Sequence, residues 1–186
     1  MRCAHCKREA ECKLEHMKPY CRHCFCELIE KRVRKELRTA GNLKANETIM
    51  LIDDGSKESA VGNYLLHNIS KSIPLTIKSV SSIEEAEAQG SEEQRIAVCQ
   101  SATMIAEDFL GELFYNTQDK KEEKKYLEVL SCVSEEEIIT FANFRNLKYK
   151  SGESHHPMKE VLEKIESQYS GSTFGITKAK KILKKD

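Results

Sequence analysis

Six of the eight cysteines of this chain lie in its first 26 residues. Four of them form two C-x-x-C pairs, Cys3 with Cys6 and Cys21 with Cys24, and fourteen residues separate the pairs. This spacing is typical of a zinc ribbon, in which each pair sits on a tight turn and offers two thiolates to one tetrahedral ion. The sequence therefore predicts a zinc ribbon over residues 1–26, with Zn²⁺ bound by these four cysteines.

Other uses of these cysteines remain open. Four thiolates also suit an iron–sulfur cluster, and dense cysteines form disulfides in an oxidising compartment. Nearby side chains that can substitute for one of the four ligands are Cys12, Cys26, His5, His16 and His23. Because four protein ligands leave no open coordination position, a zinc ion held by them would be structural. Ligation would then supply most of the folding free energy of this short polar segment.

The chain carries no signal for export or for a membrane. It begins MRCAHCKREAEC, without the apolar run of a secretory signal. It also contains no apolar stretch near the ~20 residues that cross a bilayer. We therefore expect a cytoplasmic protein with no membrane partner.

The segment after Cys24 has the pattern of an amphipathic helix. Apolar residues recur every four positions, namely Phe25, Ile29, Val33 and Leu37. Basic residues occupy its other surfaces, and a basic helix beside a zinc ribbon can follow an RNA backbone. A solvated helix face would explain the same charges. We expect a basic linker helix over residues 27–44, with four candidate tRNA phosphate contacts: Arg32, Arg34, Lys35 and Arg38.

The net charge of zero conceals an uneven distribution. Residues 1–50 hold 12 Lys and Arg against 7 Asp and Glu, and residues 145–186 hold 10 against 5. The stretch between them holds 8 against 18. Basic ends around an acidic middle suit a protein whose ends bind a polyanion, although solvated helices carry such charges equally well.

The remaining sequence alternates short apolar runs with stretches of helical periodicity. Strands are expected over 48–53, 73–80, 95–99 and 126–133, and helices over 59–69, 102–113, 135–146, 157–168 and 177–184. The charged stretches 81–94 and 117–125 are expected to be loops or short surface helices. This order predicts an α/β fold with a parallel sheet and helices on both faces.

The loop after the first expected strand is a candidate phosphate site. It reads Asp54-Gly55-Ser56-Lys57-Glu58-Ser59 and leads into a helix. Backbone N–H groups at a helix N-terminus attract anions, and ligands of parallel sheets bind beyond the carboxyl ends of the strands. The loop is not a Walker A motif, because G-x-x-x-x-G-K-[ST] is absent.

These motifs together resemble a known family, the PP-loop ATP-pyrophosphatases that 2-thiolate transfer-RNA uridines and begin with a zinc ribbon. Residues 20–35 are similar to the ribbon-to-helix junction of that family, and residues 54–59 occupy the place of its S-G-G-K-D-S loop. The resemblance implies a short Rossmann-like PP-loop domain, of the adenine nucleotide alpha-hydrolase type, over residues 45–186.

The chain departs from the family at its chemical motifs. Asp54, Ser56 and Glu58 replace the first Ser, the second Gly and the Asp of the loop. A carboxylate at position 54 facing a pyrophosphate costs on the order of 1–4 kcal/mol. The family's G-H-N-x-D-D motif falls near residues 99–104, where the Asp pair is missing, and residues 81–98 lack its catalytic C-x-x-C. We therefore expect neither ATP nor Mg²⁺ as a cofactor.

Within the resemblance, these losses imply a non-catalytic subunit, a pseudoenzyme with a vestigial phosphate loop. Its implied role is to bind tRNA and a catalytic PP-loop paralogue, as a heterodimer that 2-thiolates the wobble uridine at position 34. One alternative is an active ATP-dependent tRNA sulfurtransferase, with Lys57 and Ser59 on phosphate and Cys99 or Cys132 handling sulfur. Another is a zinc-ribbon regulatory or nucleic-acid-binding module that keeps a vestigial nucleotide site.

Overall fold

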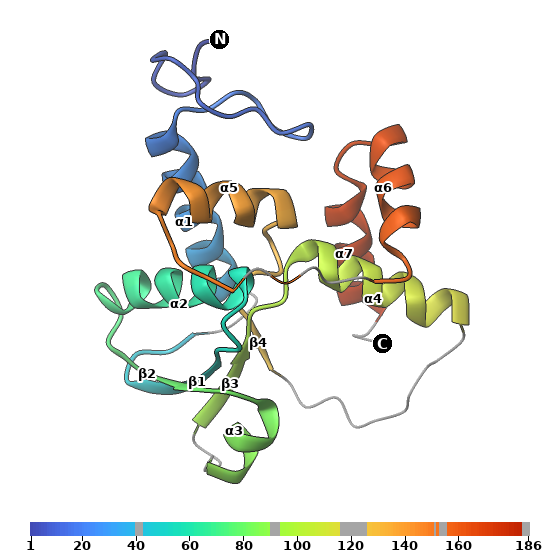
Figure 1. Cartoon of the computed structure of the whole chain (residues 1–186). Coiled ribbons are helices and arrows are strands. Elements are labelled where there is room, and N and C mark those ends of the chain that lie inside the picture. The colour runs from blue at the N-terminus through green and yellow to red at the C-terminus, as the bar shows by residue number, and fades with distance from the viewer. Residues whose placement is uncertain (40–42, 90–93, 116–125, 151, 153–155, 184–186) are drawn as a thin grey trace.

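A four-stranded parallel sheet lies at the centre of the computed structural model, which describes residues 1–39, 43–89, 94–115, 126–150, 152 and 156–183. The strand order is β2-β1-β3-β4, and every neighbouring pair is parallel (Figure 1). The strands are β1 (Glu47–Ile52), β2 (Leu75–Val80), β3 (Gln94–Val98) and β4 (Leu127–Glu128). The predicted α/β fold with a Rossmann-like parallel sheet is confirmed.

Helices cover both faces of this sheet. The described residues form α1 (Arg22–Thr39), α2 (Lys57–Ser70), α3 (Ile83–Gln89), α4 (Ala102–Tyr115), α5 (Glu135–Arg145), α6 (Lys159–Gln168) and α7 (Ser172–Leu183). Figure 1 shows α2 above the sheet, with α1 and α5 beyond it, and α3 on the opposite face. Helices α4, α6 and α7 form a second group beside the sheet, and the N-terminal segment lies beyond the start of α1.

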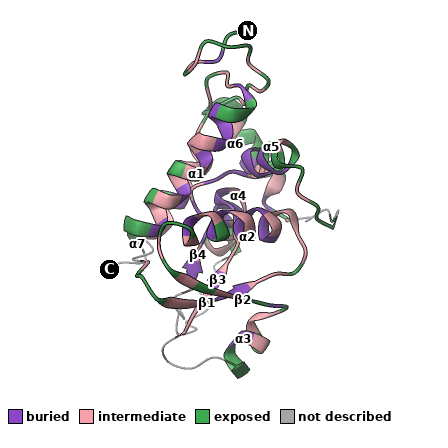
Figure 2. Cartoon of the chain, turned by 90° about the vertical axis from the view of Figure 1, so that its left-hand side faces the viewer, coloured by how far each residue is buried: buried purple, intermediate pink, exposed green. Residues whose placement is uncertain are grey.

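The apolar face of α1 is packed into the main core. The four residues that predicted this helix, Phe25, Ile29, Val33 and Leu37, are each at most 1% exposed. They share one cluster with apolar side chains of β1, α2 and α5. Figure 2 shows the same division, because buried residues line the inner sides of the helices whereas most of the N-terminal segment is exposed or half-buried.

Three elements differ clearly from the expected boundaries, and the first is α1, which starts at Arg22 rather than at the predicted 27. Strand β4 is only two residues long, because its ladder with β3 ends where Val98 pairs with Glu128. Helix α7 starts five residues before the predicted 177, because the Glu166 carboxylate accepts hydrogen bonds from the N–H groups of Gly171 and Thr173. The expected surface element in 81–94 is the short helix α3, and the stretch 117–125 lies outside the described residues.

None of the helices in the described residues combines the length and the apolar character needed to cross a membrane.

Candidate functional site

The four cysteines of the two C-x-x-C pairs converge at the start of α1. The sulfur atoms of Cys3, Cys6, Cys21 and Cys24 all lie within 4.8 Å of one another, and the Cys6 and Cys21 sulfurs are 3.6 Å apart. Three of the four residues are buried. This cluster can hold a metal ion, and it is the one group of three or more His, Cys, Asp or Glu with that geometry in the described part of the chain.

A tight turn and the start of a helix bring these cysteines together. The first pair sits on a turn closed by the hydrogen bond from the Cys3 N–H to the Arg8 carbonyl, at 2.7 Å, and Lys7 adopts a left-handed backbone with φ of 65°. The second pair lies at the N-terminus of α1.

The environments of these thiols differ. Burial of Cys3 disfavours its thiolate, but backbone hydrogen bonds from Cys6, Cys21 and His5 lower the pKa of the thiol to about 6. Burial and hydrogen bonds with the neighbouring thiols raise the pKa of Cys24 to about 12. A metal ion that binds all four sulfurs must therefore supply the charge that makes the Cys24 thiol ionise.

The other cysteines are poor candidates for sulfur chemistry. Burial raises the pKa of Cys26 to about 11 and the pKa of Cys132 to about 12. Burial also raises the pKa of Cys99, with the nearby carboxylates of Asp54 and Asp53 acting in the same direction. These groups stay neutral thiols near pH 7, and the thiolate is the reactive form.

The buried carboxylate of Glu137 contacts both the N-terminal segment and α1. The Arg32 Nη1 atom of α1 lies 2.8 Å from both carboxylate oxygens of Glu137 in α5. The Nε2 atom of His16 lies 3.2 Å from the same carboxylate, and the His16 ring meets Phe174 edge-on at 5.4 Å. The sequence marks Glu137 only as the capping-box residue of α5, a role that it also fills with Ser134.

The four candidate tRNA contacts have different environments. Lys35 and Arg38 are exposed, and no hydrogen bond or ion pair within the described residues engages their charged groups. The Arg34 Nε atom is buried without a hydrogen-bond partner in the described residues. Arg32 donates to Glu137 and to the Cys132 carbonyl, and its side chain is 29% exposed. Arg32 therefore has a structural role and is the least available of the four to a phosphate.

The loop after β1 has the backbone of an anion-binding turn. Gly55 has φ of +80°, a conformation that favours glycine, and Ser56 caps α2 by accepting a hydrogen bond from the Ser59 N–H. Two N–H groups of this turn already donate to carboxylates of the loop itself. The Asp53 carboxylate accepts from Gly55 N–H at 3.1 Å, and the Asp54 carboxylate accepts from Ser56 N–H at 2.9 Å.

The charges at this loop are also internally paired. Burial disfavours the charge of Asp54, but hydrogen bonds from Ser56 and Ser59 hold the pKa of its carboxyl below the usual range. The Lys57 ammonium lies 3.3 Å from Glu58 and 3.0 Å from Glu135. The structure therefore brings the predicted residues 54–59 together at the carboxyl edge of the sheet, with Lys57 paired to two carboxylates.

Comparison with known proteins shows which solved fold this chain resembles. No protein-family model and no curated protein matches the chain. A solved structure, that of the U34-tRNA thiolase NcsA from Methanococcus maripaludis with its 4Fe-4S cluster, superposes with a TM-score of 0.81. The match covers 98% of this chain and 87% of that chain, at 17% sequence identity. The chain shares the thiolase fold, including the N-terminal segment.

This comparison contradicts one prediction from the sequence. The altered loop and the missing motifs implied a pseudoenzyme, but the solved chain with this fold is itself a thiolase. Substitutions at Asp54, Ser56 and Glu58 are therefore insufficient to assign the protein as inactive. The match does not identify the metal of this chain, because NcsA carries an iron–sulfur cluster whereas the sequence predicts zinc.

Proposed function

We propose that this protein acts in the 2-thiolation of tRNA uridine 34 and binds tRNA through its N-terminal segment and α1. The observation that carries the proposal is the fold, which matches a U34-tRNA thiolase over 98% of the chain. The charge distribution supports a tRNA substrate, because the exposed side chains of the N-terminal segment include more cations than anions. The cations are Arg2, Lys7, Arg8, Lys13, Lys18 and Arg22, against Glu9, Glu11 and Glu15.

Phosphate contacts would also come from exposed basic residues of α1 itself. Lys35 and Arg38 extend the basic surface of the N-terminal segment along the helix. Phosphate contacts fix the position of a nucleic acid without reading its bases. The proposal keeps Arg34 as a further contact and leaves Arg32 out, because the Arg32 guanidinium already binds Glu137.

The four-cysteine cluster is proposed to hold one structural zinc ion. Sulfur atoms about 2.3 Å from a tetrahedral zinc lie about 3.8 Å from one another. The 3.6 Å between Cys6 and Cys21, and the 4.8 Å limit for the whole set, agree with that spacing. In a four-iron cluster each thiolate binds a separate iron, which spreads the sulfurs further apart. Zinc therefore fits this cluster better than 4Fe-4S.

A second subunit remains part of the proposal. The sequence resemblance implies a heterodimer with a catalytic PP-loop paralogue in the cytoplasm. Co-purification from native extract tests this idea, and recovery of the chain alone, without a paralogue or tRNA, would contradict it.

The experiment for the main proposal is tRNA binding as a function of salt. Removing one phosphate contact should lower the slope of log K against log salt by about 0.7–0.9. The double variant Lys35→Ala/Arg38→Ala should therefore reduce this slope by about 1.5 and weaken the binding of all tRNAs to a similar extent. The matched control is Lys71→Ala with Lys78→Ala, two exposed lysines outside α1, one at the end of α2 and one on β2. Equal slopes for the two double variants would show that Lys35 and Arg38 of α1 do not contact tRNA.

A second candidate function is ATP-dependent sulfur transfer by this chain itself. It is favoured by the position of the 54–59 loop, which forms a glycine turn and a capped helix start at the carboxyl edge of the sheet. ATP-dependent adenylation of tRNA by the purified zinc-loaded chain would support it. Absence of both nucleotide binding and adenylation would count against it.

A further inference from the structure

A cavity of about 610 Å³ lies where the N-terminal segment meets the start of α1 and the end of α5. Its lining includes one arginine from each of these three elements, namely Arg8, Arg22 and Arg145. The buried side chains of Cys21 and Cys26 also line it. Cavities of about 300–1,000 Å³ are the usual sites of small organic ligands, so this one has room for a single nucleotide.

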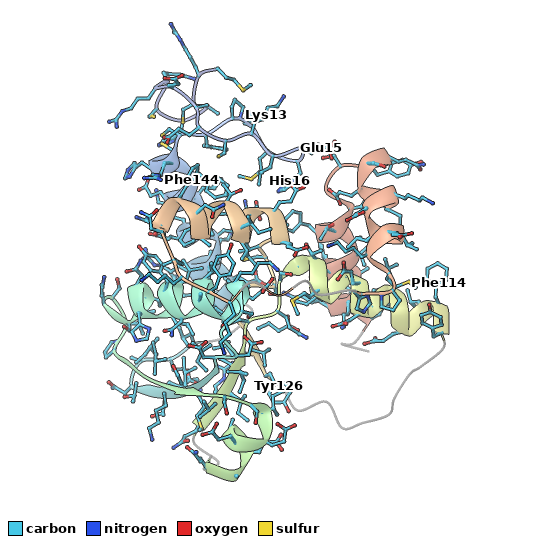
Figure 3. The ribbon with its side chains drawn as sticks, viewed as in Figure 1. Lys13, Glu15, His16, Phe114, Tyr126 and Phe144 are labelled. Atoms are coloured by element: carbon cyan, nitrogen blue, oxygen red, sulfur yellow. The ribbon has the colours of Figure 1, made fainter. Side chains whose placement is uncertain are left out.

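Two of the three arginines are held by groups that do not line the cavity. The Arg22 guanidinium lies over the Phe144 ring, 5.4 Å from its centroid. Figure 3 shows Phe144 at the end of α5, next to the start of α1. The Arg145 guanidinium lies over the Tyr64 ring at 5.5 Å and donates a hydrogen bond to the Glu30 carboxylate. An aromatic ring therefore supports each of these guanidinium planes before any ligand binds.

Two glutamates of the lining, Glu9 and Glu11, oppose the charge of the arginines. The Glu11 carboxylate already accepts a hydrogen bond from the Arg22 backbone N–H at 3.0 Å. Because three arginines meet two glutamates, the lining suits a simple anion poorly. It suits a planar ligand whose edge carries both hydrogen-bond donors and acceptors. A nucleobase has these features, because its faces stack on guanidinium planes and its edges form hydrogen bonds.

We propose that this cavity binds one unstacked nucleotide of single-stranded RNA, with its base against the Arg22 guanidinium. Phe144 covers one face of that guanidinium, which leaves the other face for the base. Arg8 and Arg145 line the same cavity and can donate hydrogen bonds to oxygens of the base or the phosphate. The inference rests on the proposed function for the source of the nucleotide, which would be an unpaired position of tRNA.

The test compares two single strands that carry the same number of phosphates, a short oligouridine and an abasic RNA of equal length. Fluorescence anisotropy measures the binding of each strand to the full zinc-loaded chain. The wild type should bind the oligouridine about fivefold or more tightly than the abasic strand, since a stacked base contributes on that scale.

The decisive variant is Arg22→Lys, which keeps the positive charge and removes the guanidinium plane. It should lose most of the preference for the oligouridine, and the salt dependence of binding should stay the same. The matched control is Arg2→Lys, at an exposed arginine outside the cavity, which should keep the preference of the wild type. The zinc content of both variants should equal that of the wild type, which shows that the N-terminal segment is folded.

Three outcomes would overturn the proposal. One is equal affinity of the wild type for the oligouridine and the abasic strand. Another is an unchanged preference in Arg22→Lys at full zinc content. The third is equally effective competition by polyglutamate of the same charge, which would show a surface for acidic chains rather than a nucleotide site.

The same measurements separate this inference from the proposed function. If tRNA binds with the expected salt slope and Arg22→Lys keeps the oligouridine preference, the inference falls and the proposed function stands. If tRNA does not bind and the oligouridine preference depends on Arg22, the proposed function falls and the cavity remains a site for single-stranded RNA.

Discussion

Arg32 and Glu137, 105 residues apart in the sequence, form an ion pair in which one guanidinium nitrogen lies 2.8 Å from both carboxylate oxygens. The Glu137 side chain is fully buried, and His16 of the N-terminal segment approaches the same carboxylate. One acidic side chain thus joins the cysteine-rich segment, α1 and α5. This arrangement sets the orientation of the proposed tRNA-binding surface relative to the sheet.

Removal of that carboxylate should destabilise the fold. Glu137→Ala leaves Arg32 and His16 without their shared partner and removes half of the α5 capping box, so we expect a loss of about 3 kcal/mol in the free energy of unfolding. Urea denaturation of the zinc-loaded protein measures this loss in the free energy of unfolding. The exposed neighbour Glu136→Ala is the control, and a loss of the same size in both variants would contradict the role of Glu137.

The same contact should depend on pH. A hydrogen bond to Glu137 raises the pKa of His16 above 6.5, against the effect of burial. Burial disfavours ionised Glu137, but the bonds from His16 and Arg32 lower the pKa of that carboxyl below 4.5. The His16 contribution is complete below pH 6.5 and is lost as pH rises through the folded pKa. The Glu137 contribution is complete above pH 4.5 and is lost as pH falls through the folded pKa.

The stabilising contact should therefore be strongest between pH 4.5 and 6.5. The measurement is the difference in unfolding free energy between wild type and His16→Gln, followed from about pH 5.5 to about pH 8.5. The difference should shrink as pH rises. A constant difference over this range would mean that His16 acts through packing on Phe174 alone.

Metal removal should unfold the N-terminal segment and leave the sheet intact. This segment has few buried apolar side chains besides its cysteines, so ligation supplies much of its stability. The purified chain should contain one zinc per molecule, and Cys21→Ser should lose both the zinc and the slow hydrogen exchange of residues 1–21. Cys132→Ser, outside the cluster, is the control. Iron with stoichiometric sulfide in place of zinc would contradict the assignment.

Local signals in the sequence were enough to predict most of the fold. The helical periodicity of residues 135–146 predicted α5, and the four-residue apolar repeat predicted α1. The C-x-x-C spacing predicted the convergence of four thiols. Each of these patterns is confined to a few neighbouring residues, whose geometry a helix or turn fixes directly.

Contacts between distant segments could not be predicted in this way. Nothing near Arg32 in the sequence shows that Glu137 will engage it, so the pattern of basic residues alone predicted a phosphate contact there. The prediction of inactivity was wrong because it rested on the altered loop and the missing motifs alone, and the solved chain that shares this fold is itself a thiolase.

The acidic loop should limit nucleotide affinity. The Asp54 carboxylate accepts a hydrogen bond from the Ser56 N–H, so this group cannot donate the same bond to a phosphate. The negative charge of the carboxylate also repels phosphate. Asp54→Ser should raise the affinity for ATP by about tenfold or more, since repulsion between like charges at a few ångströms costs on the order of 1–4 kcal/mol. Glu84→Ser, an exposed carboxylate on α3, is the control for net charge. Equal ATP affinity in wild type and Asp54→Ser would show that the carboxylate does not block the loop.

A close approach between α2 and the end of β3 permits a test of packing at the carboxyl edge of the sheet. A methyl group built at Gly62 would lie 2.2 Å from the Cys99 sulfur, a distance that forces one of them to move. Gly62→Ala should therefore destabilise the wild type by about 1–3 kcal/mol. In a Cys99→Ala background the sulfur is gone, and the same substitution should become stabilising by up to about 1 kcal/mol, because alanine favours a helix over glycine. Urea denaturation of the four proteins gives the coupling, and a Gly62→Ala effect of the same sign and size in both backgrounds would rule out the contact.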